Sequence, residues 1–204
     1  MNRLIHLVLF SLVATCNVFA QTPCAGAAEF AKGAATKFTT RGHPKSKGVV
    51  FTFKYPSGWR AAEGERPNIV QKFIGQSGSG LEMVLILTKS LPAAVTAAEM
   101  EEALLPASLK GLAPEGATNV RATSTQIEGE PAGILEFTTR QERAGFEIDG
   151  HMITLMFFQG KTMVQLQFQV VGRAPNNDLQ NRVAACRPLF QLMMNSVVFD
   201  DKWK

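Results

Sequence analysis

A strict alternation of apolar and polar side chains runs through residues 164–170, which read Val-Gln-Leu-Gln-Phe-Gln-Val, within a predicted strand over 162–171. Apolar residues occupy the even positions from Val164 to Val170, and Gln165, Gln167 and Gln169 lie between them. A period of two is that of a β-strand with one buried and one polar face. The glutamine row is a candidate surface for hydrogen bonding to a sugar or a peptide, although such a row is also common on the solvated face of a sheet.

Three further strands precede this one and are joined by short links. They span 120–128, 132–143 and 146–159, and the links contain Gly129-Glu130-Pro131, Ala144-Gly145 and Gly160-Lys161. Because links this short connect only antiparallel neighbours, the sequence predicts a four-stranded meander.

Upstream, residues 51–55, 69–74 and 81–87 also have strand patterns. In the last of them Val84 and Ile86 are apolar, and so are the residues of the opposite face from Leu81 to Leu87. This pattern favours cover on both faces of that strand.

Two helices are predicted. The final helix, with N-cap candidates at 176–178, has one apolar stripe, which places Cys186 toward the core, and Pro188 predicts a kink. The stripe consists of Leu179, Val183, Cys186, Phe190, Met193 and Val197. Thr96 and Glu99 form a capping box that begins a shorter helix, which Pro106 bends or ends. The order of elements predicts an α+β fold on a twisted antiparallel sheet with helices packed against it. We expect the strands that begin near Val49 and Met163 to lie in one layer.

The chain is long enough for one domain with its own core. It has 204 residues, of which 46% are apolar and 19% charged. Residues 21–47 are predicted to be an N-terminal tail or weak helix, and residues 48–204 a single domain. The formal net charge of +4 is spread over the sequence without a Lys/Arg cluster, so we expect no nucleic-acid partner.

The first twenty residues have the three parts of a secretory signal peptide. Arg3 gives a positive start, an apolar run reaches Cys16, and small or β-branched residues lead to Ala20. The run is short for a bilayer span, which disfavours a retained membrane anchor, and Thr15 fits poorly before a lipid-modified cysteine. The sequence therefore predicts cleavage after residue 20 and a periplasmic or secreted protein with no transmembrane segment.

Export leaves two cysteines, Cys24 and Cys186. In an oxidising compartment an even pair favours a disulfide over one buried and one exposed thiol. Such a bridge would tie the N-terminal segment to the final helix.

A family resemblance is carried by Phe51-Thr52-Phe53-Lys54-Tyr55-Pro56-Ser57-Gly58-Trp59, a strand that runs into Tyr-Pro-x-Gly-Trp. The step from Gly129 to Ala132, the hairpin 157–161 and the closing segment 196–199 follow in the expected order. The chain thus resembles the PsbP-like superfamily, including bacterial exported proteins of the DcrB type, over residues 48–200. The resemblance implies a central antiparallel sheet between helical layers, an α/β/α sandwich. It also implies action by binding partners, with no shared catalytic residues.

The sequence offers few residues for catalysis. After export it has two histidines, His43 and His151, and Ser77 and Ser79 lie in a Gly-rich hairpin rather than in a nucleophile elbow. Neither cysteine is part of a C-x-x-C pair, and no Walker A or dinucleotide glycine pattern occurs. We expect neither an enzyme nor a bound cofactor.

The best metal-like cluster is Glu147, Asp149 and His151, which alternate at a spacing of two and project from one face of a strand. Two carboxylates and an imidazole suit a divalent ion if a fourth ligand comes from elsewhere. A solvated polar strand end is the competing interpretation.

Two functional hypotheses follow. The first is an exported, non-catalytic binding or accessory protein of the cell envelope, whose partner is a protein or an envelope component. The second is a metal-binding protein or metal-dependent enzyme that uses Glu147, Asp149 and His151.

Overall fold

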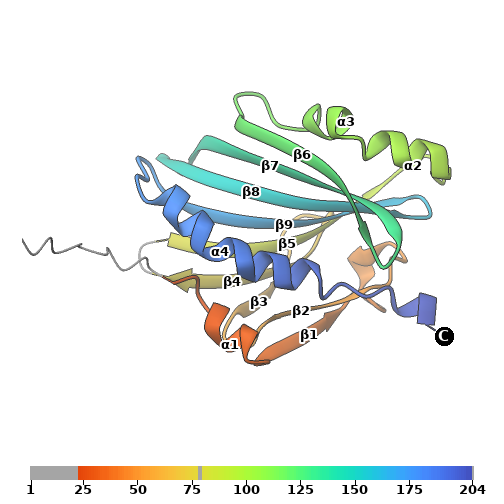
Figure 1. Cartoon of the computed structure of the whole chain (residues 1–204), viewed down its shortest axis with the longest axis horizontal. Coiled ribbons are helices and arrows are strands. Elements are labelled where there is room, and N and C mark those ends of the chain that lie inside the picture. Colours follow the sequence, from red (N-terminus) through yellow and green to blue (C-terminus); the bar gives the residue numbers. More distant parts are fainter. Residues whose placement is uncertain (1–22, 78–79, 204) are drawn as a thin grey trace, which may run out of the picture.

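A seven-stranded antiparallel sheet forms the centre of the fold (Figure 1). This computed structural model describes residues 23–77 and 80–203; the predicted signal peptide and Cys16 lie outside them. The strand order is β3-β4-β5-β9-β8-β7-β6, which confirms the predicted meander of the last four strands. The strands are β3 (Arg60–Glu63), β4 (Ile69–Ser77), β5 (Gly80–Ser90), β6 (Thr118–Ile127), β7 (Glu130–Arg143), β8 (Phe146–Gln159) and β9 (Thr162–Arg173).

The strand that begins after Val49 does not belong to this sheet, so the expectation of one layer is wrong. β2 (Thr52–Pro56) pairs with β1 (Ala35–Thr39) in a separate two-stranded sheet. Its other edge is bridged to Val198. The physical reason is the aromatic side of β2, which packs on the large sheet: Phe53 lies edge to face on Phe73 of β4 with 5.2 Å between ring centroids.

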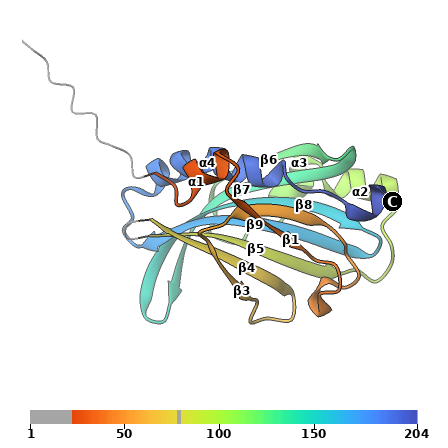
Figure 2. The ribbon, with the colours of Figure 1, turned by 90° about the horizontal axis from the view of Figure 1, so that it is seen from below.

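Helices α1 (Ala27–Ala31) and α4 (Leu179–Met194) lie with this small sheet over one face of the large sheet (Figure 2). The apolar stripe of α4 faces inward as predicted, and Phe190 lies 5.2 Å from Phe168 of β9, between ring centroids. The predicted disulfide between Cys24 and Cys186 is present, with 4.9 Å between the Cα atoms. It fastens the segment before α1 to the middle of α4.

The N-terminal segment contains more structure than a tail or weak helix. After α1 come β1 and a 3-10 helix, η1 (Pro44–Ser46), and Phe30 of α1 is part of the main core. A second 3-10 helix, η2 (Asp200–Trp203), follows α4. Within residues 23–77 and 80–203, none of the helices combines the length and apolar character needed to span a bilayer.

The other face of the large sheet carries α2 (Ala97–Ala103) and α3 (Pro106–Lys110). The Thr96–Glu99 capping box is confirmed, and Pro106 ends the first helix by starting the second. α3 packs on β6 and β7, where Leu109 contacts a second, smaller core. On this second face α3 covers only the part of the sheet formed by β6 and β7, so the implied α/β/α sandwich is not confirmed.

Candidate functional site: an open trough on the sheet

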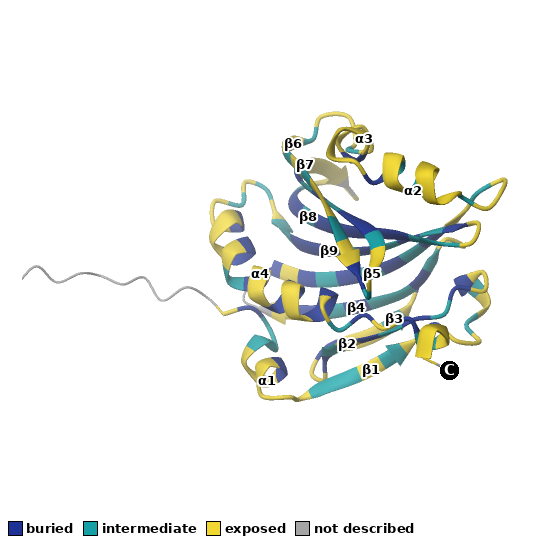
Figure 3. Cartoon of the chain, turned by 45° about the vertical axis from the view of Figure 1, so that its right-hand side comes forward, coloured by how far each residue is buried: buried dark blue, intermediate teal, exposed yellow. Residues whose placement is uncertain are grey.

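The uncovered part of this second face is a concave hollow of about 850 Å³, here called the trough. Its floor is formed by β5, β9, β8 and β7. Leu112 and Pro114, in the loop after α3, form one wall, and Glu65 and Arg66, in the loop before β4, form the other. The expected cover on both faces of β5 is only partial: on the trough face Leu81 is 40% exposed, and Met83, Leu85 and Leu87 are half-buried. Figure 3 shows α2 and α3 as mostly exposed helices.

The strand register arranges the floor in rows that cross the sheet. Leu85 pairs with Gln167, Gln167 with Thr154, and Thr154 with Leu135. The neighbouring row runs Met83, Gln169, Met152 and Phe137, and the next runs Leu87, Gln165, Met156 and Gly133. Gln165 and Gln169 thus have apolar neighbours on both sides, while Gln167 lies between Leu85 and Thr154, so uncharged polar groups cross an otherwise largely apolar floor.

The predicted glutamine row lies along the middle of this floor. Gln169 Nε2 donates to Gln167 Oε1 at 2.9 Å, and Gln165 Nε2 lies 3.7 Å from the sulfur of Met156. These amides are uncharged and have further donors and acceptors that can turn toward a ligand. The floor residues named above are all uncharged, so charged groups of the trough lie only at its walls and edges.

A second hollow of about 580 Å³, here called the apolar cleft, lies beside the trough and is lined in part by α2 and α3. The two hollows share Leu112 and Met156. Apart from Glu99 and Ser108, the side chains of the cleft are apolar: Leu91, Pro92, Ala93, Ala94, Val95, Ala103, Leu104, Leu109, Leu112, Met156, Phe158 and Met163. The carboxylate of Glu99 accepts hydrogen bonds from the backbone and hydroxyl of Thr96, so it is engaged in the helix cap.

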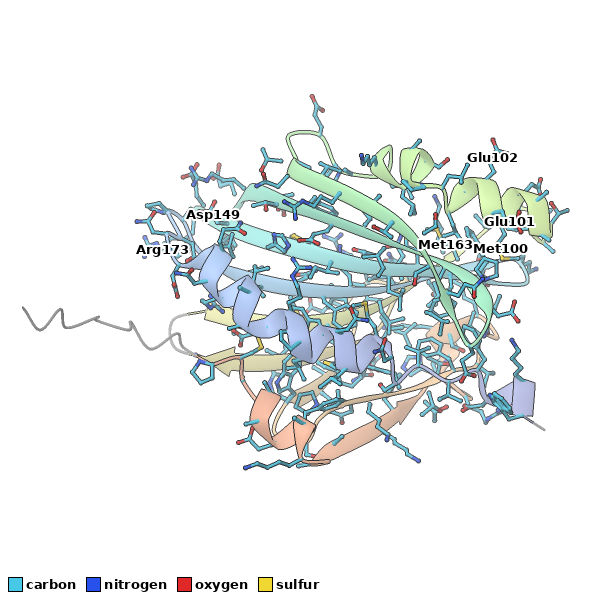
Figure 4. The ribbon with its side chains drawn as sticks, viewed as in Figure 1. Met100, Glu101, Glu102, Asp149, Met163 and Arg173 are labelled. Atoms are coloured by element: carbon cyan, nitrogen blue, oxygen red, sulfur yellow. A yellow bond between two sulfur atoms is a disulfide. The ribbon has the colours of Figure 1, made fainter. Side chains whose placement is uncertain are left out.

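Methionines are concentrated on this side of the molecule. Met83, Met152, Met156 and Met163 line the trough or the cleft. Figure 4 shows Met163 and Met100 at the same end of the structure. Methionine is flexible and polarizable, so surfaces rich in it adapt to apolar ligands of varied shape.

The predicted metal cluster does not form a common site. Asp149 accepts two hydrogen bonds from Arg140, at 2.7 and 3.1 Å. His151 Nε2 lies 2.9 Å from Glu136, while Glu147 is exposed. In the part of the chain that the structure describes, no three His, Cys, Asp or Glu side chains are arranged to hold a metal ion. The three residues lie on the α4 side of β8, the face opposite the trough.

The surroundings of these residues are those of structural ion pairs. Burial is the largest influence on His151 and lowers its pKa, although Glu136 opposes the effect. Burial alone would raise the pKa of Glu136, but the Arg187 guanidinium and His151 together hold it below its ordinary value. The pKa of Asp149 is lowered, first by its hydrogen bonds from Arg140. The network joins α4 to β7 and β8 and favours charged Glu136 beside neutral His151.

Comparison with known proteins leaves the family open. No family model matches the chain, so the PsbP-like resemblance is not confirmed, and no curated protein matches it. Among solved structures, LpqN of Mycobacterium tuberculosis, described as involved in cell envelope biogenesis, aligns with a TM-score of 0.46 at 12% identity, over 86% of this chain and 98% of its own. A protein of Bacteroides thetaiotaomicron aligns with a TM-score of 0.39 at 13% identity, over 81% of this chain and 48% of its own. These scores are too low to assign a family or a function.

Proposed function

We propose that this chain is an exported, non-catalytic binding protein that holds the acyl chain of an envelope lipid in the trough and the apolar cleft. The observation that carries the proposal is that the two hollows lie side by side and share Leu112 and Met156 in their linings. Their volumes of about 580 and 850 Å³ fall within the range of about 300–1,000 Å³ usual for small-molecule sites.

The position of the trough favours an acyl chain over a peptide. A peptide that adds to a sheet does so at an edge, where backbone groups are free. The trough lies on a face, where the backbone groups of β5, β9, β8 and β7 already pair with neighbouring strands. A buried peptide would need a partner for each of its own backbone groups, and the apolar cleft contributes only Glu99 and Ser108 as polar side chains. An acyl chain has no such requirement.

The expected affinity follows from the apolar area that a chain would bury. Each buried methylene contributes about 0.8 kcal/mol, so ten contribute about 8 kcal/mol. Association costs at least about 4 kcal/mol of this in lost freedom. For ten methylenes the remainder is at most about 4 kcal/mol, which corresponds to a dissociation constant of about one millimolar or weaker.

The disulfide supports the exported location. Disulfides persist in oxidising compartments and are rare in the cytosol, where thiols are kept reduced. Both Cys24 and Cys186 are buried, so the bridge is part of the folded core. An extracytoplasmic protein with a lipid-sized hollow would meet its ligand in the envelope.

The test is titration of the purified chain with the uncharged fluorophore N-phenyl-1-naphthylamine, followed by displacement with dodecan-1-ol. Leu85→Glu places a charge on the trough floor and is expected to weaken fluorophore binding at least about tenfold, because a buried unpaired charge is costly. Leu192→Glu is the matched control, since Leu192 is 44% exposed on α4. A saturable signal lost only in Leu85→Glu supports the proposal. Absence of binding by wild type, or equal loss in both variants, refutes it.

A further inference from the structure

A third hollow, here called the rim pocket, opens where the trough and the apolar cleft meet. It has a volume of about 330 Å³. It shares Leu87 and Gln165 with the trough and Met163 with the cleft. The remaining residues around it are polar or charged: Lys47, Asn68, Thr88, Lys89 and Ser90.

Two lysines place positive charge at this junction. Lys89 pairs in register with Met163 of β9, and both alternate with buried core residues, so Lys89 projects on the trough face. Lys47 reaches the same point from η1, where its Nζ donates to the carbonyl of Thr88 at 3.2 Å. Both side chains are exposed at the edge of an apolar surface.

These charges are not neutralised within the described residues. Nearby lysines are paired, Lys45 with Glu63 at 3.0 Å and Lys72 with Glu65 at 2.6 Å. No described carboxylate forms an ion pair with Lys47 or Lys89. The rim pocket therefore presents the positive charges of Lys47 and Lys89 beside Leu87 of the trough and Met163 of the apolar cleft.

We infer that the rim pocket binds the anionic headgroup, a carboxylate or phosphate, of the lipid whose chain lies in the hollows. The inference rests on the proposed function and adds the charge of the ligand to it. An amphiphile has one charged end and one apolar end, which is the arrangement offered by Lys47 and Lys89 beside Leu87 and Met163. Asn68 and Ser90 add neutral hydrogen-bonding groups around the same point.

The experiment compares probes with the same twelve-carbon chain and different heads: dodecanoate, dodecyl phosphate and dodecan-1-ol. Each is titrated calorimetrically at low salt, below its aggregation concentration, against wild type and the double variant Lys47→Gln/Lys89→Gln. The control is Lys37→Gln/Lys54→Gln, which removes two exposed lysines that face each other across β1 and β2. Both variants therefore lose the same net charge.

Wild type is expected to bind the two anions about tenfold more tightly than dodecan-1-ol, because close charge pairs near a protein surface contribute on this order. The rim variant should reduce this preference to about twofold or less, with dodecan-1-ol binding unchanged, and the control should keep it. Higher salt should also reduce the preference. Equal wild-type affinity for all three probes, or equal losses in both variants, overturns the inference while leaving the proposed function intact. If no probe binds wild type, both proposals fail.

Discussion

The buried ion pair between Glu82 of β5 and Arg182 of α4 offers the sharpest test of how the helix is held on the sheet. Their charged atoms lie 2.7 Å apart, and the side chains are 0% and 7% exposed. Arg182 Nη1 also donates to the carbonyl of Val171 at 3.2 Å. Replacing either partner leaves the other charge buried, so Glu82→Leu or Arg182→Met is each expected to cost about 3–5 kcal/mol. The double variant removes both charges and should cost far less than the sum of the two.

The assay is urea unfolding of wild type, both single variants and the double variant, analysed as a double-mutant cycle. We expect a coupling energy of about 3 kcal/mol or more. The exposed pair Arg41 and Asp201, whose side chains are 46% and 55% exposed, is the control cycle and should couple by less than about 1 kcal/mol. Single-variant costs below about 1 kcal/mol, or additive costs in the buried cycle, would show that this pair does not hold α4 on the sheet.

Three further predictions concern stability. Cys24→Ala/Cys186→Ala opens a loop of 162 residues and should cost about 5 kcal/mol in the chain-entropy description, lowering Tm by about 10–20 °C in calorimetry; a drop below about 2 °C would contradict it. Gly133→Ala would place a Cβ 2.6 Å from Leu109 Cδ1, so Tm should fall by an amount equivalent to about 1–3 kcal/mol, and an unchanged Tm would mean that α3 moves freely. Because the folded-state pKa of Glu136 lies below its ordinary 4.5, its stabilising contribution is present above that pH and is lost as pH falls through the lowered value. In a plot of the free energy of unfolding against pH, Glu136→Gln should therefore have a smaller slope on the acid side than wild type. Equal acid-side slopes in the two proteins would exclude this role for Glu136.

The large sheet was predictable because its strands carry local signals. β8 spans the predicted residues 146–159, and the short links around it allow only antiparallel neighbours. The small sheet was not predictable to the same extent. β1 has a single large apolar residue, Phe38, among alanine, threonine and lysine, so neither its pairing with β2 nor the separation of β2 from the main sheet is visible in local patterns.

The trough was predictable only in part. The glutamine row identified a polar strand face, and the structure places it on the trough floor. The apolar face of β5 from Leu81 to Leu87 was predicted to be covered, since sequence alone does not distinguish cover by another element from an open hollow. The cleft depends on α3 packing closely over Gly133, a contact between distant segments. The rim lysines give no sequence signal, because they meet only through the fold.

The layer that contains α1, β2 and α4 has a consequence for biogenesis. A polypeptide is synthesised from its N-terminus, so the thiol of Cys24 emerges 162 residues before its partner. Phe168 of β9 likewise gains its ring contact with Phe190 only after α4 has been made. A product truncated before α4 would therefore keep a free sulfhydryl and an uncovered aromatic surface, which makes it chemically distinguishable from the completed chain and open to capture by thiol oxidoreductases or to aggregation.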